Sequence, residues 1–234
     1  MASHANFFIE DVPFEFEIQG DTLYGNDEVL LNKDDNLIKD TSFNEAGYTI
    51  VPFLSNEKYN ELEAGITKLI KGYLEKITKG DLSHFSLEKY HEFIKSDEEH
   101  LQVVKNLNKG ISQQLFPIDI RTLDKIVSEV CGIDVTSDYE KLKITQNTFS
   151  IRIVRPNRLN DNNPPHRDVW LDLLRNCVNI YVPLAGSNKN SALSIIPGSH
   201  YWKESEIERT AAGAQINNVS YTVPCVVGAK KGLH

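Results

Sequence analysis

The stretch Asn163-Pro164-Pro165-His166-Arg167-Asp168-Val169-Trp170 places a His-x-Asp triplet where an extended run is expected to begin. In a strand, residues i and i+2 point to the same side, so His166 and Asp168 can reach one ion while Arg167 points elsewhere. A second histidine would complete the 2-His-1-carboxylate site that binds non-heme Fe(II) and leaves coordination positions open. The triplet therefore predicts two ligands of a metal site in a β structure.

The composition is typical of a globular domain, with 234 residues that are 40% hydrophobic and 25% charged. The net charge of −8 argues against nucleic acid as a main partner, because phosphate binding requires a basic face. Acidic small molecules are not excluded, since an acidic protein can have a local basic pocket. The chain has neither an apolar run near the roughly 18 residues that span a bilayer nor a signal-peptide pattern. We expect a cytoplasmic protein without membrane contact.

The three cysteines, Cys131, Cys177 and Cys225, are far apart in the chain. No Cys-x-x-Cys is present, so the sequence indicates neither a zinc cluster nor a disulfide framework. We expect each cysteine to be a small buried apolar residue.

Helices are predicted in the first half of the chain. Apolar residues at steps of three and four predict a helix over 55–80, with Ser55 as N-cap and Gly80 as its stop. Further helices are expected within 86–115 and over about 118–131, the second ending at Gly132. Residues 1–40 are compatible with short strands or with a draped arm.

Strands are predicted mainly in the second half. Alternation at period two indicates strands at 144–154, 178–184, 193–196 and 219–227, and a short one at 49–53. This order predicts an α+β fold in which a helical layer supports an antiparallel sandwich. We expect one domain over 1–234, with an arm at 1–42, mainly helical support at 43–140 and strands at 141–234.

Three stretches of the sequence resemble the phytanoyl-CoA dioxygenase family of Fe(II)/2-oxoglutarate-dependent oxygenases. They are the entry segment 43–55 with Phe43 and Gly47, the His166–Asp168 triplet, and the strand 179–184 followed by residues 193–200, which end in Pro-Gly-Ser-His. The resemblance implies a double-stranded β-helix, or jelly roll, with N-terminal helices packed outside it. It also implies Fe(II) and 2-oxoglutarate as cofactors, with O2 and a small organic molecule as substrates.

The sequence departs from the family near its end, where a distal His and an Arg for 2-oxoglutarate usually follow a Gly-Asp/Glu-x-x-x-Phe stretch. Here Val227 is followed only by Gly-Ala-Lys-Lys-Gly-Leu-His. The expectation is a chain that lacks its last two core strands and is catalytically incomplete. An exposed sheet edge would then favour a homo-oligomer. Three alternatives remain for the third metal ligand: it is absent, it is His234, or it is His200. For His200, a structural hydrogen bond is favoured over metal binding.

The resemblance assigns His166 and Asp168 as metal ligands and catalytic residues. Four more residues are candidates for binding the cofactor: Ser150 and Arg152 on the polar side of one predicted strand, and Asn179 and Tyr181 on another. Ser150 and Arg152 would face either the lumen of the jelly roll or solvent. The core is favoured for Trp170, with a substrate-facing indole as the alternative.

The sequence supports three functions from different classes. The first is an Fe(II)/2-oxoglutarate-dependent dioxygenase that hydroxylates a small organic substrate and releases succinate. The second is a non-catalytic jelly-roll binding module without a full metal triad. The third is a zinc- or manganese-dependent enzyme similar to cupins. The identity of the substrate is not readable from the residues.

Overall fold

The computed structural model describes residues 2–9, 12–31, 36–108, 117–137, 149–158, 161–171, 174–175, 177–188 and 191–230. They form two compact units. The first, called the sheet unit, comprises 1–49, 159–180 and 193–234, and the second, called the helical unit, comprises 50–158 and 181–192. The single domain over 1–234 stays a prediction.

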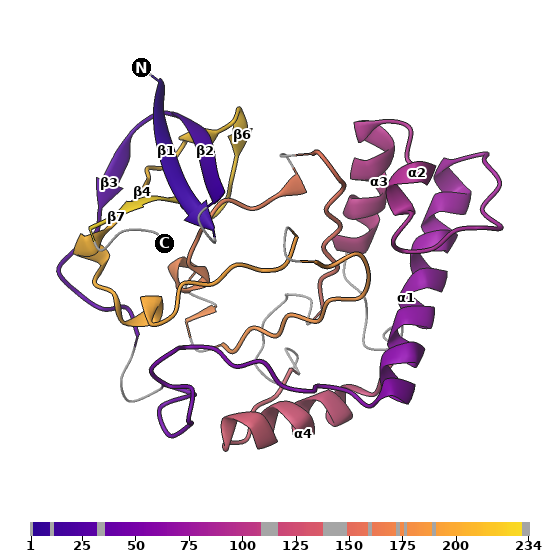
Figure 1. Cartoon of the computed structure of the whole chain (residues 1–234), viewed down its shortest axis with the longest axis horizontal. Coiled ribbons are helices and arrows are strands. Elements are labelled where there is room, and N and C mark those ends of the chain that lie inside the picture. Colours follow the sequence, from indigo (N-terminus) through magenta and orange to yellow (C-terminus); the bar gives the residue numbers. More distant parts are fainter. Residues whose placement is uncertain are drawn as a thin grey trace. The chain divides into compact units, whose positions relative to one another are not determined.

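The helical unit is built around α1 (Asn56–Ile77) (Figure 1). Ser55 is its N-cap, as predicted, because its hydroxyl accepts from the backbone N–H of Lys58 at 3.3 Å. The helix ends three residues before Gly80, at Ile77. Its buried residues recur at steps of four, which places them in one stripe: Leu62, Ile66, Ile70 and Leu74.

Three further helices belong to this unit: α2 (Tyr90–Phe93), α3 (Asp97–Asn108) and α4 (Ile120–Cys131). The helix expected within 86–115 is present as α2 and α3, and residues 109–116, which include Gly110, lie outside the described part. Gly132 ends α4 as predicted, with a φ of 70° and its N–H donating to the Ser128 carbonyl at 2.8 Å. None of the helices in the described ranges is long and apolar enough to cross a membrane.

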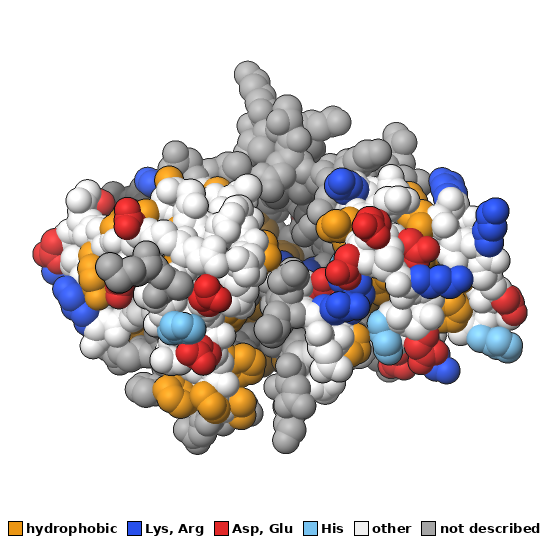
Figure 2. Space-filling view, turned by 90° about the horizontal axis from the view of Figure 1, so that it is seen from above, with side chains coloured by type: hydrophobic (Ala, Val, Ile, Leu, Met, Phe, Trp, Pro, Cys, Tyr) orange, Lys and Arg blue, Asp and Glu red, His pale blue; other side chains and the backbone are white. Residues whose placement is uncertain are grey.

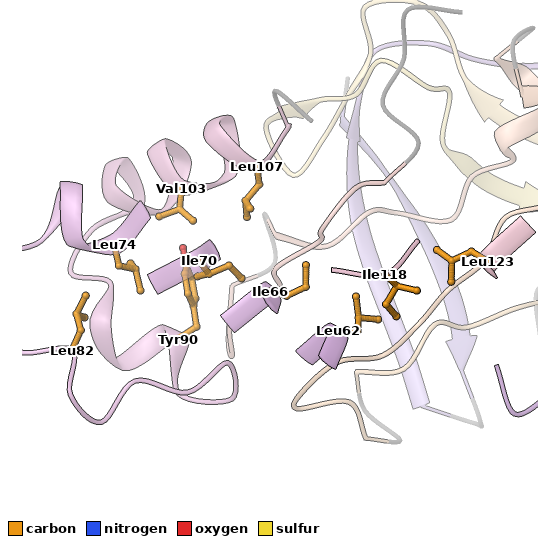
Figure 3. Close-up of a cluster of buried hydrophobic side chains, with 10 residues drawn as sticks. All are labelled: Leu62, Ile66, Ile70, Leu74, Leu82, Tyr90, Val103, Leu107, Ile118 and Leu123. Carbon is orange, nitrogen blue, oxygen red and sulfur yellow. The ribbon is translucent and has the colours of Figure 1, made fainter. Parts of the chain in front are cut away.

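The core of the helical unit joins α1 to α3, α4 and the segment before α4 (Figure 3). Side chains of 149–153 and 182–184 pack against the same core. Tyr59 on α1 donates to the carbonyls of Pro183 and Leu184, at 3.0 and 2.8 Å. Acidic and basic side chains are interspersed over the helices on the face shown in Figure 2, as expected for a solvated surface.

The sheet unit contains two antiparallel sheets (Figure 1). The first has the order β1-β2-β5-β6 and the second β3-β4-β7. Their bounds are β1 Ala2–Ile9, β2 Val12–Gln19, β3 Thr22–Tyr24, β4 Ile207–Thr210, β5 Gln215–Ile216, β6 Val219–Ser220 and β7 Val226–Ala229. Of the two alternatives for the N-terminal residues, the structure has the short strands. They pair with strands near the other end of the sequence, so the strands do not simply follow the helices.

One apolar cluster is shared by the two sheets. Ala5, Phe7 and Ile18 come from β1 and β2, and Ile207 and Val226 come from β4 and β7. The Phe7 and Phe16 rings meet edge to face, with centroids 5.4 Å apart. The described residues thus form a mixed fold of α-helices and antiparallel β-sheets, and they form no closed barrel.

Several predicted strands are wrong in the described part of the chain. No strand is present at 49–53, 149–154, 178–184 or 193–196, and residues 144–148 lie outside the described part. The alternation was nevertheless informative at 149–154, where Phe149, Ile151 and Ile153 pack against the core and the residues between them are exposed. Alternation predicts which side of a segment is buried, whereas a strand also requires a backbone partner. The expectation of a buried cysteine is wrong for Cys177, which is exposed, and confirmed for Cys131 and Cys225.

The Pro-Gly-Ser-His turn packs against the entry segment within the sheet unit. Gly198 N–H donates to the Ala46 carbonyl at 2.8 Å. His200 Nε2 lies 2.9 Å from the Asn44 carbonyl, and Tyr201 donates to the Asn44 side chain at 2.6 Å. Gly47 has a φ of +80°, and a Cβ added to it would lie 2.3 Å from His200 Nδ1. The entry segment can therefore approach the turn only because residue 47 is glycine.

We expect Leu107→Ala to lower the free energy of unfolding by about 2–5 kcal/mol, because it leaves a cavity in the core of the helical unit. Leu107 is 1% exposed, whereas Leu101 on the same helix is 51% exposed. Leu101→Ala is the matched control and should cost less than about 1 kcal/mol. Urea denaturation measures both, and equal losses would contradict the assignment of Leu107 to the core.

We expect Gly47→Ala to destabilise the protein more than Gly213→Ala does. Both glycines have left-handed backbones, with φ of +80° and +84°, but a Cβ at Gly213 meets no atom within 4 Å. The control carries only the backbone strain of about 1–2 kcal/mol, whereas Gly47→Ala adds a clash with His200 worth about 1–3 kcal/mol. Thermal unfolding should show the difference, and His200→Ala should remove most of it. A difference that persists without the imidazole would contradict this packing.

Candidate functional site

His166 and Asp168 converge in the sheet unit. His166 Nε2 lies 3.2 Å from Asp168 Oδ1, and the two side chains are 29% and 38% exposed. The predicted strand is absent here: Asp168–Trp170 form a 3-10 turn. Arg167 just before it is extended, with φ −119° and ψ 120°, so the residues on either side of it still point the same way.

The His166 ring is oriented by its other nitrogen. Nδ1 lies 2.8 Å from the Pro164 carbonyl oxygen, which can only accept a hydrogen bond. With the proton on Nδ1, Nε2 faces the Asp168 carboxylate and can hold either a proton or a metal ion there. Metal-binding histidines usually donate their second N–H to a carbonyl or carboxylate in this way.

Asp168 is held from both of its oxygens. Oδ1 faces His166, and Oδ2 accepts a hydrogen bond from the Asn179 side-chain amide. The hydrogen bond with His166 is the largest cause that holds the pKa of Asp168 below its usual value, and Asn179 adds to it against the opposing effect of burial. Asp168 is therefore a carboxylate at neutral pH, as a ligand for a cation must be.

The two donors fit one divalent cation. Two ligands at right angles, each about 2.1 Å from an ion, lie about 3 Å apart, close to the observed 3.2 Å. Among the described residues, no group of three or more His, Cys, Asp or Glu side chains could hold a metal ion. His200 makes the structural hydrogen bond that was favoured for it, and His234 lies outside the described residues. The described part of the chain thus provides two donors.

The remaining predicted residues are divided between the units. Asn179 belongs to the sheet unit and contacts Asp168. Ser150, Arg152 and Tyr181 are exposed residues of the helical unit. Their place relative to His166, and their binding of 2-oxoglutarate, stay predictions.

One residue of the site neighbourhood was missed by sequence reasoning. Glu204 is 2% exposed, and its carboxylate accepts hydrogen bonds from Arg167, Trp170 and Arg209. It lies in the run Lys-Glu-Ser-Glu at 203–206, which is typical of a solvated turn. Nothing in that run distinguishes Glu204 from Glu206, because its burial depends on partners distant in the sequence. Trp170 packs against the sheet-unit core, as favoured.

Comparison with known proteins agrees with the three stretches that suggested a family. The family model for phytanoyl-CoA dioxygenase (PhyH) matches residues 43–227, which include His166, Asp168 and the Pro-Gly-Ser-His turn. No curated protein and no solved structure matches the chain. Because the match covers most of the sequence, the chain belongs to the phytanoyl-CoA dioxygenase family.

Proposed function

We propose that this protein is an Fe(II)- and 2-oxoglutarate-dependent dioxygenase that hydroxylates a small organic molecule. The observation that carries the proposal is the convergence of His166 Nε2 and Asp168 Oδ1 at 3.2 Å. This convergence is found in a chain whose family generally uses Fe(II) and 2-oxoglutarate. The antiparallel sheets are consistent with the jelly roll of this family, and the closed form of that fold is part of the proposal.

His166 and Asp168 would hold the iron. A neutral imidazole and one carboxylate leave a bound Fe(II) with a net single positive charge, which favours an anionic oxo acid as the next ligand. When bound, iron with 2-oxoglutarate and O2 supplies the oxidation of an unactivated C–H bond.

The residues around the pair keep the two donors in place. Pro164 fixes the His166 ring by accepting from Nδ1, and Asn179 holds Oδ2 of Asp168. Because one Asp168 oxygen is held, the other stays directed at His166 Nε2. Such outer contacts commonly change metal affinity or activity by about 10- to 100-fold when they are removed.

The cofactor-binding roles of the other residues complete the proposal. Arg152 would pair with a carboxylate of 2-oxoglutarate, for which a guanidinium is suited because it can donate two parallel hydrogen bonds. Ser150, Tyr181 and Asn179 would donate further hydrogen bonds. A non-catalytic binding module is not favoured, since the family is one of dioxygenases.

We expect the protein, in a form that supplies the third metal ligand, to release succinate from 2-oxoglutarate in the presence of Fe(II), ascorbate and O2. A chelator should abolish the release and added Fe(II) should restore it, because the reaction depends on the bound metal. Succinate quantified by mass spectrometry, with an anaerobic sample as control, measures the outcome. Release that is unchanged by the chelator and by removal of O2 would contradict the proposal.

We expect Asp168→Ala to weaken Mn(II) binding at least about 100-fold, since it removes an anionic ligand rather than an outer contact. Mn(II) replaces Fe(II) here because it is stable in air, and calorimetry measures its affinity. The melting temperature should change little, because the Asp168 side chain is 38% exposed and outside the apolar cores. Asp81→Ala, at a surface turn where Asp81 bonds to Ser83, is the matched control. Equal Mn(II) affinity in the two variants would refute the assignment of Asp168.

A further inference from the structure

The carboxylate of Glu204 bonds to both residues that frame the turn of Asp168. Arg167, immediately before Asp168, donates to Oε1. Trp170, two residues after it, donates its indole N–H to Oε2 at 2.7 Å. Both ends of the segment that carries Asp168 are therefore attached to one buried group.

Arg209 on β4 completes the cluster. It donates to Glu204 Oε2 at 2.7 Å, and its guanidinium carbon lies 5.0 Å from the centre of the Trp170 ring. Arg167 also donates to the His200 carbonyl at 3.3 Å. The turn that carries Asp168 is thus tied to β4 and to the Pro-Gly-Ser-His turn, which are parts of the same unit.

Glu204 is itself held firmly by its backbone. Its N–H donates to the Glu28 carbonyl at 2.8 Å, and its carbonyl accepts from the Gly25 N–H at 3.1 Å. A Cβ added to Gly25 would lie 2.6 Å from Glu204 Cβ, so the two backbones approach closely. A side chain with a fixed backbone and 2% exposure is a rigid support.

The charges make the support specific for a carboxylate. Arg167 and Arg209 would repel one another in a buried setting, and the negative charge of Glu204 lies between their donors. An amide could still accept from Trp170 but would leave two guanidinium groups without their common anion. Loss of the negative charge of Glu204 should therefore release Arg167 and make the position of Asp168, the next residue, less fixed.

We propose that Glu204 is a positioning residue of the metal site, which fixes Asp168 by holding Arg167 and Trp170. The inference rests on the proposed function, because it assumes that Asp168 binds the metal. Glu204 contacts the neighbours of Asp168 and acts on the metal only through them. Glu204, together with Arg167 and Trp170, thereby sets the direction of one metal ligand, Asp168.

The experiment compares Glu204→Gln, Trp170→Phe and the control Glu206→Gln by Mn(II) calorimetry. Trp170→Phe removes one indole N–H and leaves every charge in place. Glu206→Gln makes the same chemical change as Glu204→Gln two residues away, where the side chain accepts a hydrogen bond from the backbone N–H of Lys203 at 3.2 Å. We expect Mn(II) affinity to fall about tenfold or more in the first two variants, and to stay within about twofold of the parent in the control.

A second readout separates positioning from general stability. The absorption spectrum of bound Co(II) at saturating metal reports the arrangement of its ligands in the folded protein. We expect it to change in Glu204→Gln and Trp170→Phe. A role in stability alone would lower the melting temperature and leave both the affinity and the Co(II) spectrum of the folded protein unchanged, which would overturn the proposal.

The outcomes also distinguish this proposal from the one on which it rests. If Asp168→Ala binds Mn(II) as tightly as the parent does, the proposed function fails. If Asp168→Ala loses the metal while Trp170→Phe and Glu204→Gln keep parental affinity and spectrum, only the role of Glu204 fails. Should Glu204→Gln not fold, Trp170→Phe alone decides, because it leaves the buried charges paired.

Discussion

A carboxylate removed from water must find donors that replace its hydration, and the sheet unit is organised around one such group. Glu204 is nearly inaccessible to solvent and accepts from two guanidinium groups and an indole. Removing one partner of a buried ion pair typically lowers the free energy of unfolding by about 3–5 kcal/mol, whereas replacing the whole cluster with apolar residues can leave stability unchanged. The cluster therefore contributes geometry more than net stability. It connects the end of β3, the His166–Asp168 segment and β4, which are far apart in the sequence.

The pair proposed to bind the metal, His166 and Asp168, depends on one local and one non-local constraint. Spacing alone brings the two donors to one side, because the single extended residue Arg167 lies between them. Their final orientation depends on groups outside the triplet, the Pro164 carbonyl on His166 and the Asn179 amide on Asp168. A ligand pair of this kind is useful for chemistry only when such contacts restrict it. This is the physical link between family membership and the proposed activity.

The Pro-Gly-Ser-His turn has a packing role in the described structure. Its histidine bonds to the Asn44 carbonyl and fills the space that a side chain at Gly47 would need. Two of the stretches that carried the family resemblance are thus in direct contact, although about 150 residues separate them. A family signature can therefore mark a close packing contact between two segments as well as a reactive group. His200 is an example of such a packing residue.

The sequence by itself determined the helices and the proximity of His166 to Asp168, because these depend on neighbours within a few residues. Ser55 and Gly132 bound their helices through local caps, and the period of apolar residues identified the buried stripe of α1. Strand pairing was decided only by the tertiary structure: β2 pairs with β5 about 200 residues away, and the alternation at 149–154 predicted burial without a ladder. The burial of Glu204 was likewise decided only by the tertiary structure, since a glutamate is usually exposed. Its burial follows from the arginines and the tryptophan that the folded chain places around it, and long-range contacts of this kind leave no pattern in the local sequence.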